Sequence, residues 1–189
     1  LSKQSVFAAK NWIEKNLSKN YASQAPRFFK TKSKLAQEAH EAIRPSQSDL
    51  APEKFKTDNK QEYKLYDLIW RRFIASQMPQ AVFDSTIINI WTSDVRILNK
   101  YTFKAAGLVM KFDGFLKIWP TQFEEKELPL LEENEELKLL EINPSQHFTE
   151  PAPRYNEASL IKTLEEYGIG RPSTYAPIIS VIQDRNYVF

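Results

Sequence analysis

The sequence predicts an α+β protein with a helical segment, then an antiparallel β-strand segment that forms an arch, then a helix-turn-helix or winged-helix-like segment. Three observations predict this order. Apolar residues recur at helical spacing up to about residue 80, β-branched and aromatic runs begin at Phe83, and helical spacing returns at Asn156. We place the segments at residues 1–82, 83–150 and 151–189.

In the first segment, apolar side chains at intervals of three and four predict a helix over residues 5–16: Val6, Ala9, Ile13 and Leu17. The same spacing predicts a second helix over residues 61–77, stopped by Pro79, with a large buried face: Leu65, Tyr66, Ile69, Trp70, Phe73 and Ile74.

Strands are predicted over residues 86–91, 95–103 and 108–119, which turn residues such as Asp113 and Gly114 separate. Residues 137–142 suggest one more strand beyond an acidic loop. A linker or extended crossing follows, marked by three prolines: Pro144, Pro151 and Pro153.

The last segment begins with a helix from Asn156 to a terminating Gly168. A short turn then leads into a second helix, for which Ser173 is the predicted N-cap, and residues 187–189 begin a strand. Helix, turn, helix and strand is the order of a winged helix-turn-helix.

The amino-acid composition limits the kinds of fold and site that the chain can have. The chain of 189 residues is 42% hydrophobic and 13% aromatic, which is enough for packed cores. It has no cysteine, which excludes disulfides and thiolate metal sites. Because neither a membrane span nor a signal-peptide pattern is present, we expect no membrane partner and a cytoplasmic location.

Charge is unevenly placed. Residues 1–60 hold twelve Lys or Arg against six Asp or Glu, a balance of +6, and residues 121–141 hold two against eight, a balance of −6. The N-terminal part is therefore the candidate polyanion-facing surface. The alternative is that both stretches are ordinary solvated faces.

The start of the last helix is a candidate anion site. A capped helix directs backbone N–H groups and the positive end of its dipole at a ligand in front of it. Several side chains in this region can contact phosphate: Arg171, Ser173, Thr174, Gln183 and Arg185. Tyr175 lies on the apolar face of the helix, which favours a core role over base stacking.

His40 is the second candidate. Glu38, Glu41 and Arg44 lie close enough on a helical turn to orient His40 or to share a phosphate with it, and the alternative is a surface ion pair. The other histidine, His147, stands alone and is predicted to be structural or exposed.

Complete catalytic or metal motifs are absent from the sequence. It has no His-Glu-x-x-His, cysteine pair or Asp-x-Asp motif, so no metal ligands are predicted. With four glycines, a Walker loop and a dinucleotide fingerprint are excluded. No serine, cysteine or aspartate shows a nucleophile signature.

Several motifs in order closely resemble the bacterial type IA DNA topoisomerases. They are Glu-Ala-His-Glu-Ala-Ile-Arg-Pro at residues 38–45, Pro-Arg-Tyr-Asn-Glu-Ala-Ser-Leu-Ile at 153–161 and Gly-Ile-Gly-Arg-Pro-Ser-Thr-Tyr-Ala at 168–176. Shorter similar fragments lie between them at 66–71, 76–78, 83–86 and 112–114, so the resemblance spans essentially the whole chain.

The resemblance implies relaxation of negatively supercoiled DNA without ATP. In this family a tyrosine attacks one DNA strand and holds its 5′ phosphate covalently, another strand passes, and the break is resealed. The family nucleophile lies in a Tyr-x-Arg-Thr-Asp-Ser motif, which none of the eight tyrosines here occupies. The acidic residues that bind Mg²⁺ belong to a Rossmann-like domain that is also absent from this sequence.

By position in the motifs, His40 would support the scissile or a neighbouring phosphate and Arg44 would add a permanent charge. Arg171, Ser173 and Thr174 would hold the single-strand backbone, with Gln183 and Arg185 in support. Arg154 fits either a DNA contact or the linker.

We therefore expect a central fragment of a type IA topoisomerase that binds single-stranded DNA without cleaving it, and that can associate with itself through strand edges left unpaired. Two alternatives stay open. One is a non-enzymatic winged-helix module that reads duplex DNA, and the other is an interaction domain that uses the acidic loop.

Overall fold

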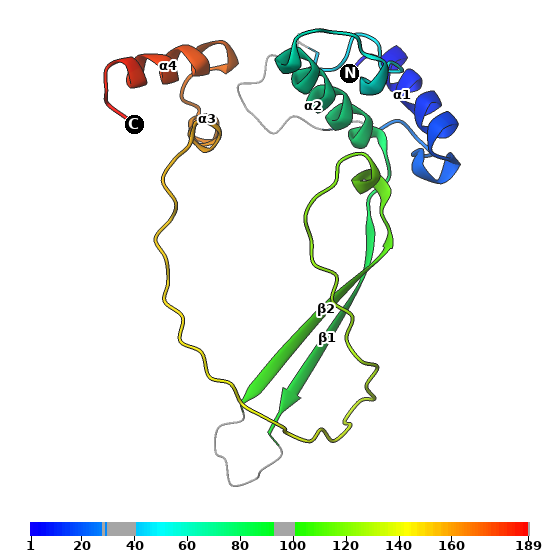
Figure 1. Cartoon of the computed structure of the whole chain (residues 1–189), viewed down its shortest axis with the longest axis vertical. Coiled ribbons are helices and arrows are strands. Elements are labelled where there is room, and N and C mark those ends of the chain that lie inside the picture. The colour runs from blue at the N-terminus through cyan, green and yellow to red at the C-terminus, as the bar shows by residue number, and fades with distance from the viewer. Residues whose placement is uncertain (28, 30–40, 93–100, 189) are drawn as a thin grey trace. The chain divides into compact units, whose positions relative to one another are not determined.

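The computed structural model describes residues 1–27, 29, 41–92 and 101–188 (Figure 1). They belong to two compact units, of which the first draws on residues 1–28 and 41–135 and the second on residues 29–40 and 136–189. The fold class is mixed, with helices and an antiparallel two-stranded sheet, as the sequence predicts. The division into three segments stays a prediction.

Both helices expected in the first unit are confirmed. Helix α1 spans Lys3–Asn16 and helix α2 spans Lys60–Gln77. Each has a side-chain cap, because the Ser2 hydroxyl oxygen accepts a hydrogen bond from the Ser5 N–H at 3.2 Å and the Asn59 side-chain oxygen accepts one from the Gln61 N–H at 2.9 Å.

The core of the first unit lies where α1 and α2 pack side by side (Figure 1). The rings of Trp12 and Trp70 meet edge to face with centroids 4.7 Å apart, the favourable geometry for two aromatic quadrupoles. The buried cluster contains Ala9, Ile13, Ala51, Trp70, Phe73, Ile74, Ala75, Met78 and Ile118. Two short 3-10 helices, η1 (Lys19–Tyr21) and η2 (Pro52–Lys54), lie in the connecting segments.

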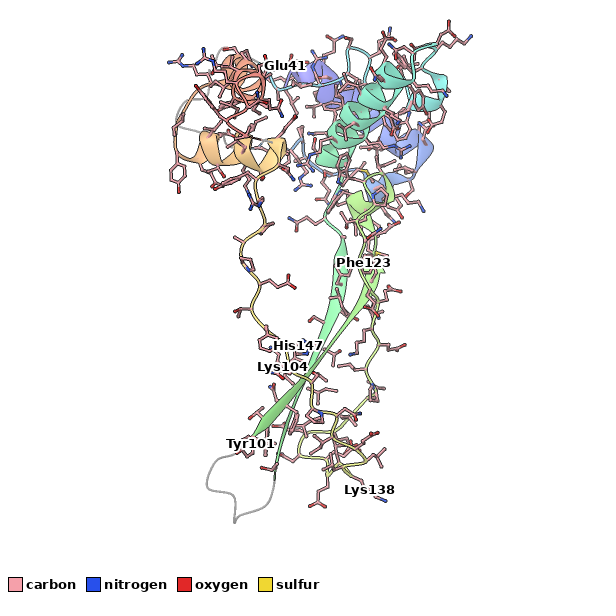
Figure 2. The ribbon with its side chains drawn as sticks, turned by 60° about the vertical axis from the view of Figure 1, so that its left-hand side comes forward. Glu41, Tyr101, Lys104, Phe123, Lys138 and His147 are labelled. Atoms are coloured by element: carbon pink, nitrogen blue, oxygen red, sulfur yellow. The ribbon has the colours of Figure 1, made fainter. Side chains whose placement is uncertain are left out.

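Strands β1 (Val82–Trp91) and β2 (Thr102–Phe112) form an antiparallel pair in which Phe83 lies opposite Met110 and Trp91 opposite Thr102. The predicted strand over residues 95–103 falls largely outside the described residues. Phe123 packs edge to face on Phe83, with ring centroids 5.3 Å apart, and lies beside the strands in Figure 2.

The strand predicted over residues 108–119 is too long. Strand β2 ends at Phe112, and the next turn is the 3-10 helix η3, Gly114–Lys117. Gly114 has a φ of +49°, and a Cβ atom there would lie 2.5 Å from the carbonyl oxygen of Gln80. The apolar residues after it pack on the helical core rather than extending the sheet, which explains why their β-like composition misled the prediction.

The strand predicted over residues 137–142 is also wrong. The segment has no strand structure and all of its residues are exposed, including Leu140 at 86%. Neither β1 nor β2, the strands of the described residues, pairs with it. An apolar β-prone run forms a strand only where a ladder partner accepts its backbone hydrogen bonds, and none of the described strands does so.

The second unit contains helices α3 (Glu157–Glu166) and α4 (Pro172–Asp184). The first of them starts at Asn156 as expected, with reciprocal hydrogen bonds between Asn156 and Ser159. Ser173 is not the N-cap of α4, because the helix begins earlier, with Arg171 as its N-cap and Pro172 in the first turn. Proline suits that position since its missing N–H has no helical partner there.

The strand expected at residues 187–189 is not formed at Tyr187 and Val188, and Phe189 lies outside the described residues. Tyr187 instead donates its backbone N–H to the Ile182 carbonyl oxygen at 2.9 Å, which closes the end of α4. No helix among the described ranges is long and apolar enough to cross a membrane.

Candidate functional site

Arg44 is held by a neighbouring carboxylate. Its Nε atom donates to one carboxylate oxygen of Glu41 at 2.7 Å, and a terminal nitrogen donates to the other at 3.0 Å. The remaining terminal nitrogen donates to the Pro45 carbonyl oxygen at 3.1 Å. Glu41 therefore occupies the edge of the guanidinium formed by Nε and one terminal nitrogen.

The helical turn predicted around His40 is wrong for the described part of the motif. His40 itself lies outside the described residues, but residues 41–45 have no helical structure. Pro45 accounts for this, because the residue before a proline is disfavoured in the α conformation. Glu41 and Arg44 meet through their side chains although the backbone between them is irregular.

Each group of this pair stabilises the ionised form of the other. Hydrogen bonding from Arg44, and then from the Ser2 backbone N–H, lowers the pKa of Glu41 from 4.5 to about 2. The Glu41 carboxylate in turn raises the pKa of Arg44 above its ordinary value. Both groups are ionised at neutral pH, so a phosphate that approaches Arg44 must replace Glu41 or share the guanidinium with it.

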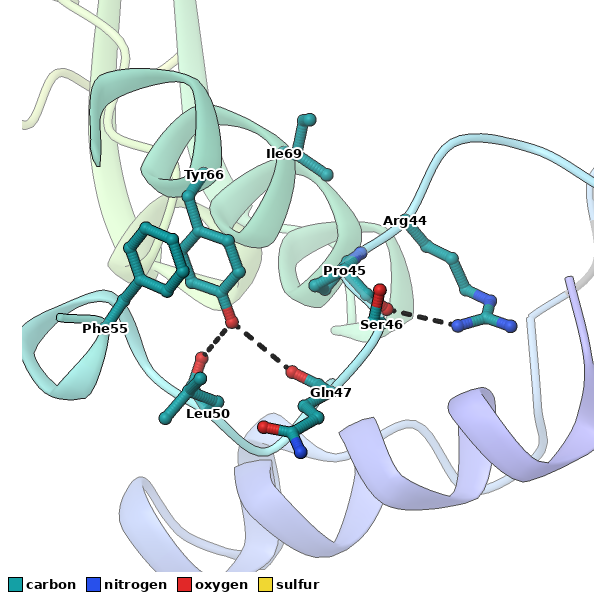
Figure 3. Close-up of a pocket in the computed structure, with 8 residues that line it drawn as sticks. All are labelled: Arg44, Pro45, Ser46, Gln47, Leu50, Phe55, Tyr66 and Ile69. Atoms are coloured by element: carbon teal, nitrogen blue, oxygen red, sulfur yellow. Dashed lines mark hydrogen bonds between the residues drawn. The ribbon is translucent and has the colours of Figure 1, made fainter. Parts of the chain in front are cut away.

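A pocket of about 400 Å³ lies beside Arg44 (Figure 3). The loop of residues 44–50 forms one wall of this open pocket, and helix α2 with Phe55 forms the other. Its lining contains Arg44, Pro45, Ser46, Gln47, Leu50, Phe55, Tyr66 and Ile69.

The walls of this pocket are tied together. The Tyr66 hydroxyl donates to the Leu50 carbonyl oxygen at 2.7 Å, and the Trp70 indole N–H donates to the Ser48 carbonyl oxygen at 3.0 Å, so two aromatic side chains of α2 anchor the loop. Phe55 stacks on Tyr66 with ring centroids 4.1 Å apart and planes 9° from parallel (Figure 3). Burial, and then the charge of Asp49, raises the pKa of the Tyr66 hydroxyl.

The turn before α4 brings Arg171, Ser173 and Thr174 together. Gly168 and Gly170 have φ values of 69° and 76°, in the left-handed region that glycine adopts at no steric cost. A Cβ atom on Gly170 would lie 3.2 Å from both the Thr174 hydroxyl oxygen and the Tyr175 ring. The two glycines thus let the chain turn from α3 into α4, whose first turn brings the Arg171 backbone within reach of Thr174.

Thr174 forms the cap of this turn. Its hydroxyl oxygen accepts the Arg171 backbone N–H at 2.8 Å, and its hydroxyl donates to the Arg171 carbonyl oxygen at 3.0 Å. The single hydroxyl hydrogen of Thr174 is therefore used within the turn, so this side chain orders the start of α4.

Arg171 and Ser173 remain exposed at the start of α4. Pro172 has no N–H, and the backbone N–H groups of Thr174 and Tyr175 both donate to the Arg171 carbonyl oxygen. Within the described part of the chain, the Ser173 N–H has no such partner, and it points out of the helix end with its own hydroxyl nearby. This end of the helix can offer a guanidinium, a hydroxyl and a backbone N–H to one anion.

The other two predicted side chains lie at the opposite end of α4. Thirteen helical residues separate Arg171 from Arg185, which places them about 20 Å apart along the axis. Gln183 lies next to α3, where its amide donates to Glu157 at 3.4 Å, and Arg185 is exposed. They cannot share one phosphate with Arg171, but they lie along the same helix.

The structure also describes three further residues that the sequence singled out. Tyr175 is buried at 9% exposure, which confirms the core role over base stacking. Arg154 is exposed in the extended segment before α3. His147 is exposed too, and its Nε2 atom lies 2.8 Å from the Ser145 hydroxyl. Across the ranges that the structure describes, no three His, Asp or Glu side chains gather as metal ligands.

Sequence reasoning missed the pocket. Glu41 and Arg44 were visible as neighbours in the motif, but nothing in the sequence marks Phe55 as a partner of Tyr66, because the two rings meet across a loop. The only signal was indirect, since Tyr66 and Ile69 fall at the edge of the apolar face of α2.

The chain is similar to known proteins over its whole length. A family model described as DNA topoisomerase matches residues 1–189. DNA topoisomerase 1 of Rickettsia felis is 47% identical over 195 residues, which cover 100% of this chain and 25% of that protein. DNA topoisomerase 1 of Haemophilus influenzae is 45% identical over 191 residues, covering 100% of this chain and 21% of that protein.

A solved structure agrees with these relatives. The structure of full-length topoisomerase I from Thermotoga maritima matches with a TM-score of 0.80 and 36% sequence identity, over 100% of this chain and 29% of that one. The chain thus spans about a quarter of the length of the relatives it matches.

Proposed function

The chain belongs to the DNA topoisomerase family, and from this premise we propose that it is the part of a type IA enzyme that holds a single DNA strand beside the cleavage centre. The parent protein would relax negatively supercoiled DNA by transient cleavage through a 5′-phosphotyrosine, strand passage and religation. This chain would bind the strand without cutting it. A cytoplasmic location belongs to the same proposal, since DNA is the substrate.

The exposed start of α4 is the observation that carries the proposal. A phosphate placed before Ser173 would meet the unpaired Ser173 N–H, the Ser173 hydroxyl and the Arg171 guanidinium. Thr174 fixes the turn beforehand, so little conformational entropy is lost when the phosphate binds. Phosphate contacts of this kind position a strand without reading its sequence.

Gln183 and Arg185 extend this surface. Because they lie about 20 Å from Arg171 along α4, they would contact other phosphates of the same strand. The cationic and polar side chains would then follow the backbone along the helix, which is how single-stranded DNA is held without sequence preference.

Arg44 and His40 have a different proposed role, close to the reacting phosphate. Arg44 would transfer its two fork donors from the Glu41 carboxylate to a phosphate of the same geometry. His40 would support that phosphate, as the resemblance implies. The nucleophilic tyrosine and the Mg²⁺ ligands would come from other parts of the parent enzyme, because this sequence has no Tyr-x-Arg-Thr-Asp-Ser motif.

The duplex-reading alternative has less support. A winged-helix reader needs polar side chains on its recognition helix for base edges, whereas α4 carries Ile178, Val181 and Ile182 there. We therefore retain the single-strand proposal.

Fluorescence anisotropy with a labelled single-stranded oligonucleotide tests it. Arg171→Ala should weaken binding and reduce the slope of log K against log salt by roughly 0.7, the value expected when one phosphate contact on a single strand is lost. Lys162→Ala is the matched control, because it removes a cation of the same unit that pairs with Glu166 at 4.0 Å. Equal affinity and slope in wild type and Arg171→Ala would refute the site.

A further inference from the structure

Strands β1 and β2 form a two-stranded ribbon whose base makes a contact that the proposed function does not use. Residues 112–114, one of the fragments that the sequence singled out, lie where β2 returns to the helical core of α1 and α2 (Figure 1). We propose that the hydrogen bond from Tyr21 to Asp113 is a latch, which fixes the angle of the ribbon on the helical core and whose loss lets the ribbon turn about residues 78–81 and Asp113. The latch is independent of DNA binding.

Two short irregular segments connect the ribbon to the helical core. Residues 78–81 separate α2 from β1, and Asp113 alone separates β2 from η3. The Phe115 backbone N–H donates to the Pro79 carbonyl oxygen at 3.0 Å, so the two segments are tied to each other. They form one joint, because a few residues at the ends of elements can absorb the changes of φ and ψ that turn a whole ribbon.

Tyr21 joins the helical core to this joint. It lies in η1, and its side chain packs against the buried cluster of the core. Its hydroxyl donates to one carboxylate oxygen of Asp113 at 2.6 Å, and its ring lies beside the Phe112 ring with centroids 5.0 Å apart. A hydrogen bond to a carboxylate is roughly twice as strong as one between neutral groups. Since Asp113 is itself the link between β2 and η3, holding its side chain restrains the backbone rotation that a turn of the ribbon requires.

The space beside this contact is not close-packed. An open groove of about 690 Å³ is lined by Asn20, Ser23 and Gln24 from the segment after α1, and by Pro79 and Phe112 from the base of the ribbon. Close packing is what resists small shifts of one element against another. The groove therefore leaves the ribbon room to move once the Tyr21 hydrogen bond is lost.

The Tyr21 hydroxyl is the specific partner of Asp113. The hydrogen bond to Asp113, then burial and the charge of Asp113, raise the pKa of Tyr21, so its hydroxyl keeps the proton that it donates at neutral pH. The Lys117 Nζ atom lies 3.8 Å from the other carboxylate oxygen, beyond hydrogen-bond distance. This exposed lysine adds a weak ion pair and does not fix the geometry.

Double electron–electron resonance between two spin labels tests the latch. Because the chain has no cysteine, labels can be attached through Lys64→Cys on α2 and Lys104→Cys on β2, two exposed positions. With Tyr21 present the distance distribution should be narrow. Tyr21→Phe keeps the ring and removes the hydroxyl, so the distribution should become at least about twofold wider as the ribbon samples more orientations. Dilution with unlabelled chain removes distances between copies.

Variants of Asp113 separate the hydrogen bond from a general loss of packing. Asp113→Asn keeps an acceptor oxygen for Tyr21 and should stay narrow, whereas Asp113→Ala should widen the distribution as much as Tyr21→Phe does. Combining Asp113→Ala with Tyr21→Phe should widen it no further, because both changes remove one interaction. Lys117→Ala is the matched control, since it removes the other neighbour of Asp113 and should leave the width unchanged.

Amide hydrogen exchange in α1 and α2 checks that each variant keeps its helical core. If Tyr21→Phe loses that core, the comparison of Asp113→Asn with Asp113→Ala decides. A distribution as narrow in Tyr21→Phe and Asp113→Ala as with both residues present would overturn the latch, because other contacts would then fix the ribbon. A distribution that is wide with Tyr21 and Asp113 in place would overturn it too, since the ribbon would not be fixed at all.

Discussion

At the scale of single residues, Glu41 holds the Arg44 side chain in one orientation. Exposed ion pairs contribute little to stability in general, and here the two side chains are 24% and 36% exposed. The pair matters for geometry, because a bidentate carboxylate fixes the orientation of the guanidinium plane. A phosphate then meets a fork whose orientation is already set.

The low pKa of Glu41 provides a measurement of its hydrogen bonds to Arg44. The pKa in the folded chain, about 2, is below the ordinary 4.5, so its stabilising contribution is complete above about pH 4.5 and is lost as the pH falls toward 2. Carboxyl ¹³C NMR should show Glu41 titrating near 2 in the wild type and at a clearly higher pH in Arg44→Gln. The same midpoint in both proteins would contradict the hydrogen bonds from Arg44.

At the scale of elements, the order of the α3–α4 region depends on its caps. Asn156 accepts the Ser159 N–H at 2.8 Å and Ser159 accepts the Asn156 N–H at 2.9 Å, while Thr174 closes the next turn around Arg171. These short helices bury little, since Tyr175 and Ile179 are the buried apolar side chains among the described residues of the second unit. Local hydrogen bonds therefore carry an unusual share of their stability.

Asn156→Ala should destabilise α3 by about 1 kcal/mol, because it leaves a backbone N–H at the helix start without its acceptor. Amide hydrogen exchange should become faster at Ser159 and its neighbours in the first turn. Asn143→Ala is the control, since Asn143 is exposed and lies outside any helix. Unchanged protection in Asn156→Ala would show that packing, and not the cap, holds the start of α3.

At the scale of the whole molecule, β1 leaves one edge of the sheet open. The backbone N–H and carbonyl of Leu108 both pair with Lys126, so they point away from β1. In an antiparallel pair the residue opposite, Ser85, must then point its own backbone groups away from β2, and so must Ile87 two residues on. Among the described strands, nothing pairs with this edge of β1.

We expect the isolated chain to associate with itself through this edge, because an unpaired strand is a template for another. Sedimentation velocity should show association that rises with concentration, and Ile87→Pro should reduce it by removing an outward N–H without breaking a bond to β2. Ile87→Ala keeps that N–H and tests the side chain alone. Association that survives Ile87→Pro and falls with Ile87→Ala would assign it to apolar contact.

The isolated chain of 189 residues should neither relax supercoiled DNA nor form a covalent adduct with it. Both steps need a nucleophilic tyrosine in the family motif, which this sequence does not contain. Agarose gels with negatively supercoiled plasmid, with the full-length parent enzyme as the positive control, provide the measurement. Relaxed topoisomers produced by the purified chain would overturn the division of roles proposed here.

The sequence by itself determined the elements whose cause is local. Apolar spacing predicted α1 and α2 to within two residues, Asn156 marked the start of α3, and the ordered motifs indicated the family. These features depend on side chains a few residues apart, whose geometry is the same in any helix.

Only the tertiary structure decided which potential contacts are made. The apolar run at 137–142 did not become a strand because a ladder needs a partner that no local pattern supplies, and residues after Gly114 left the sheet because the helical core buries them. The hydrogen bond from Arg44 to Glu41 and the stacking of Phe55 on Tyr66 each join residues that irregular loop backbone separates. Spacing in the sequence cannot predict such contacts, since loop backbone has no fixed period.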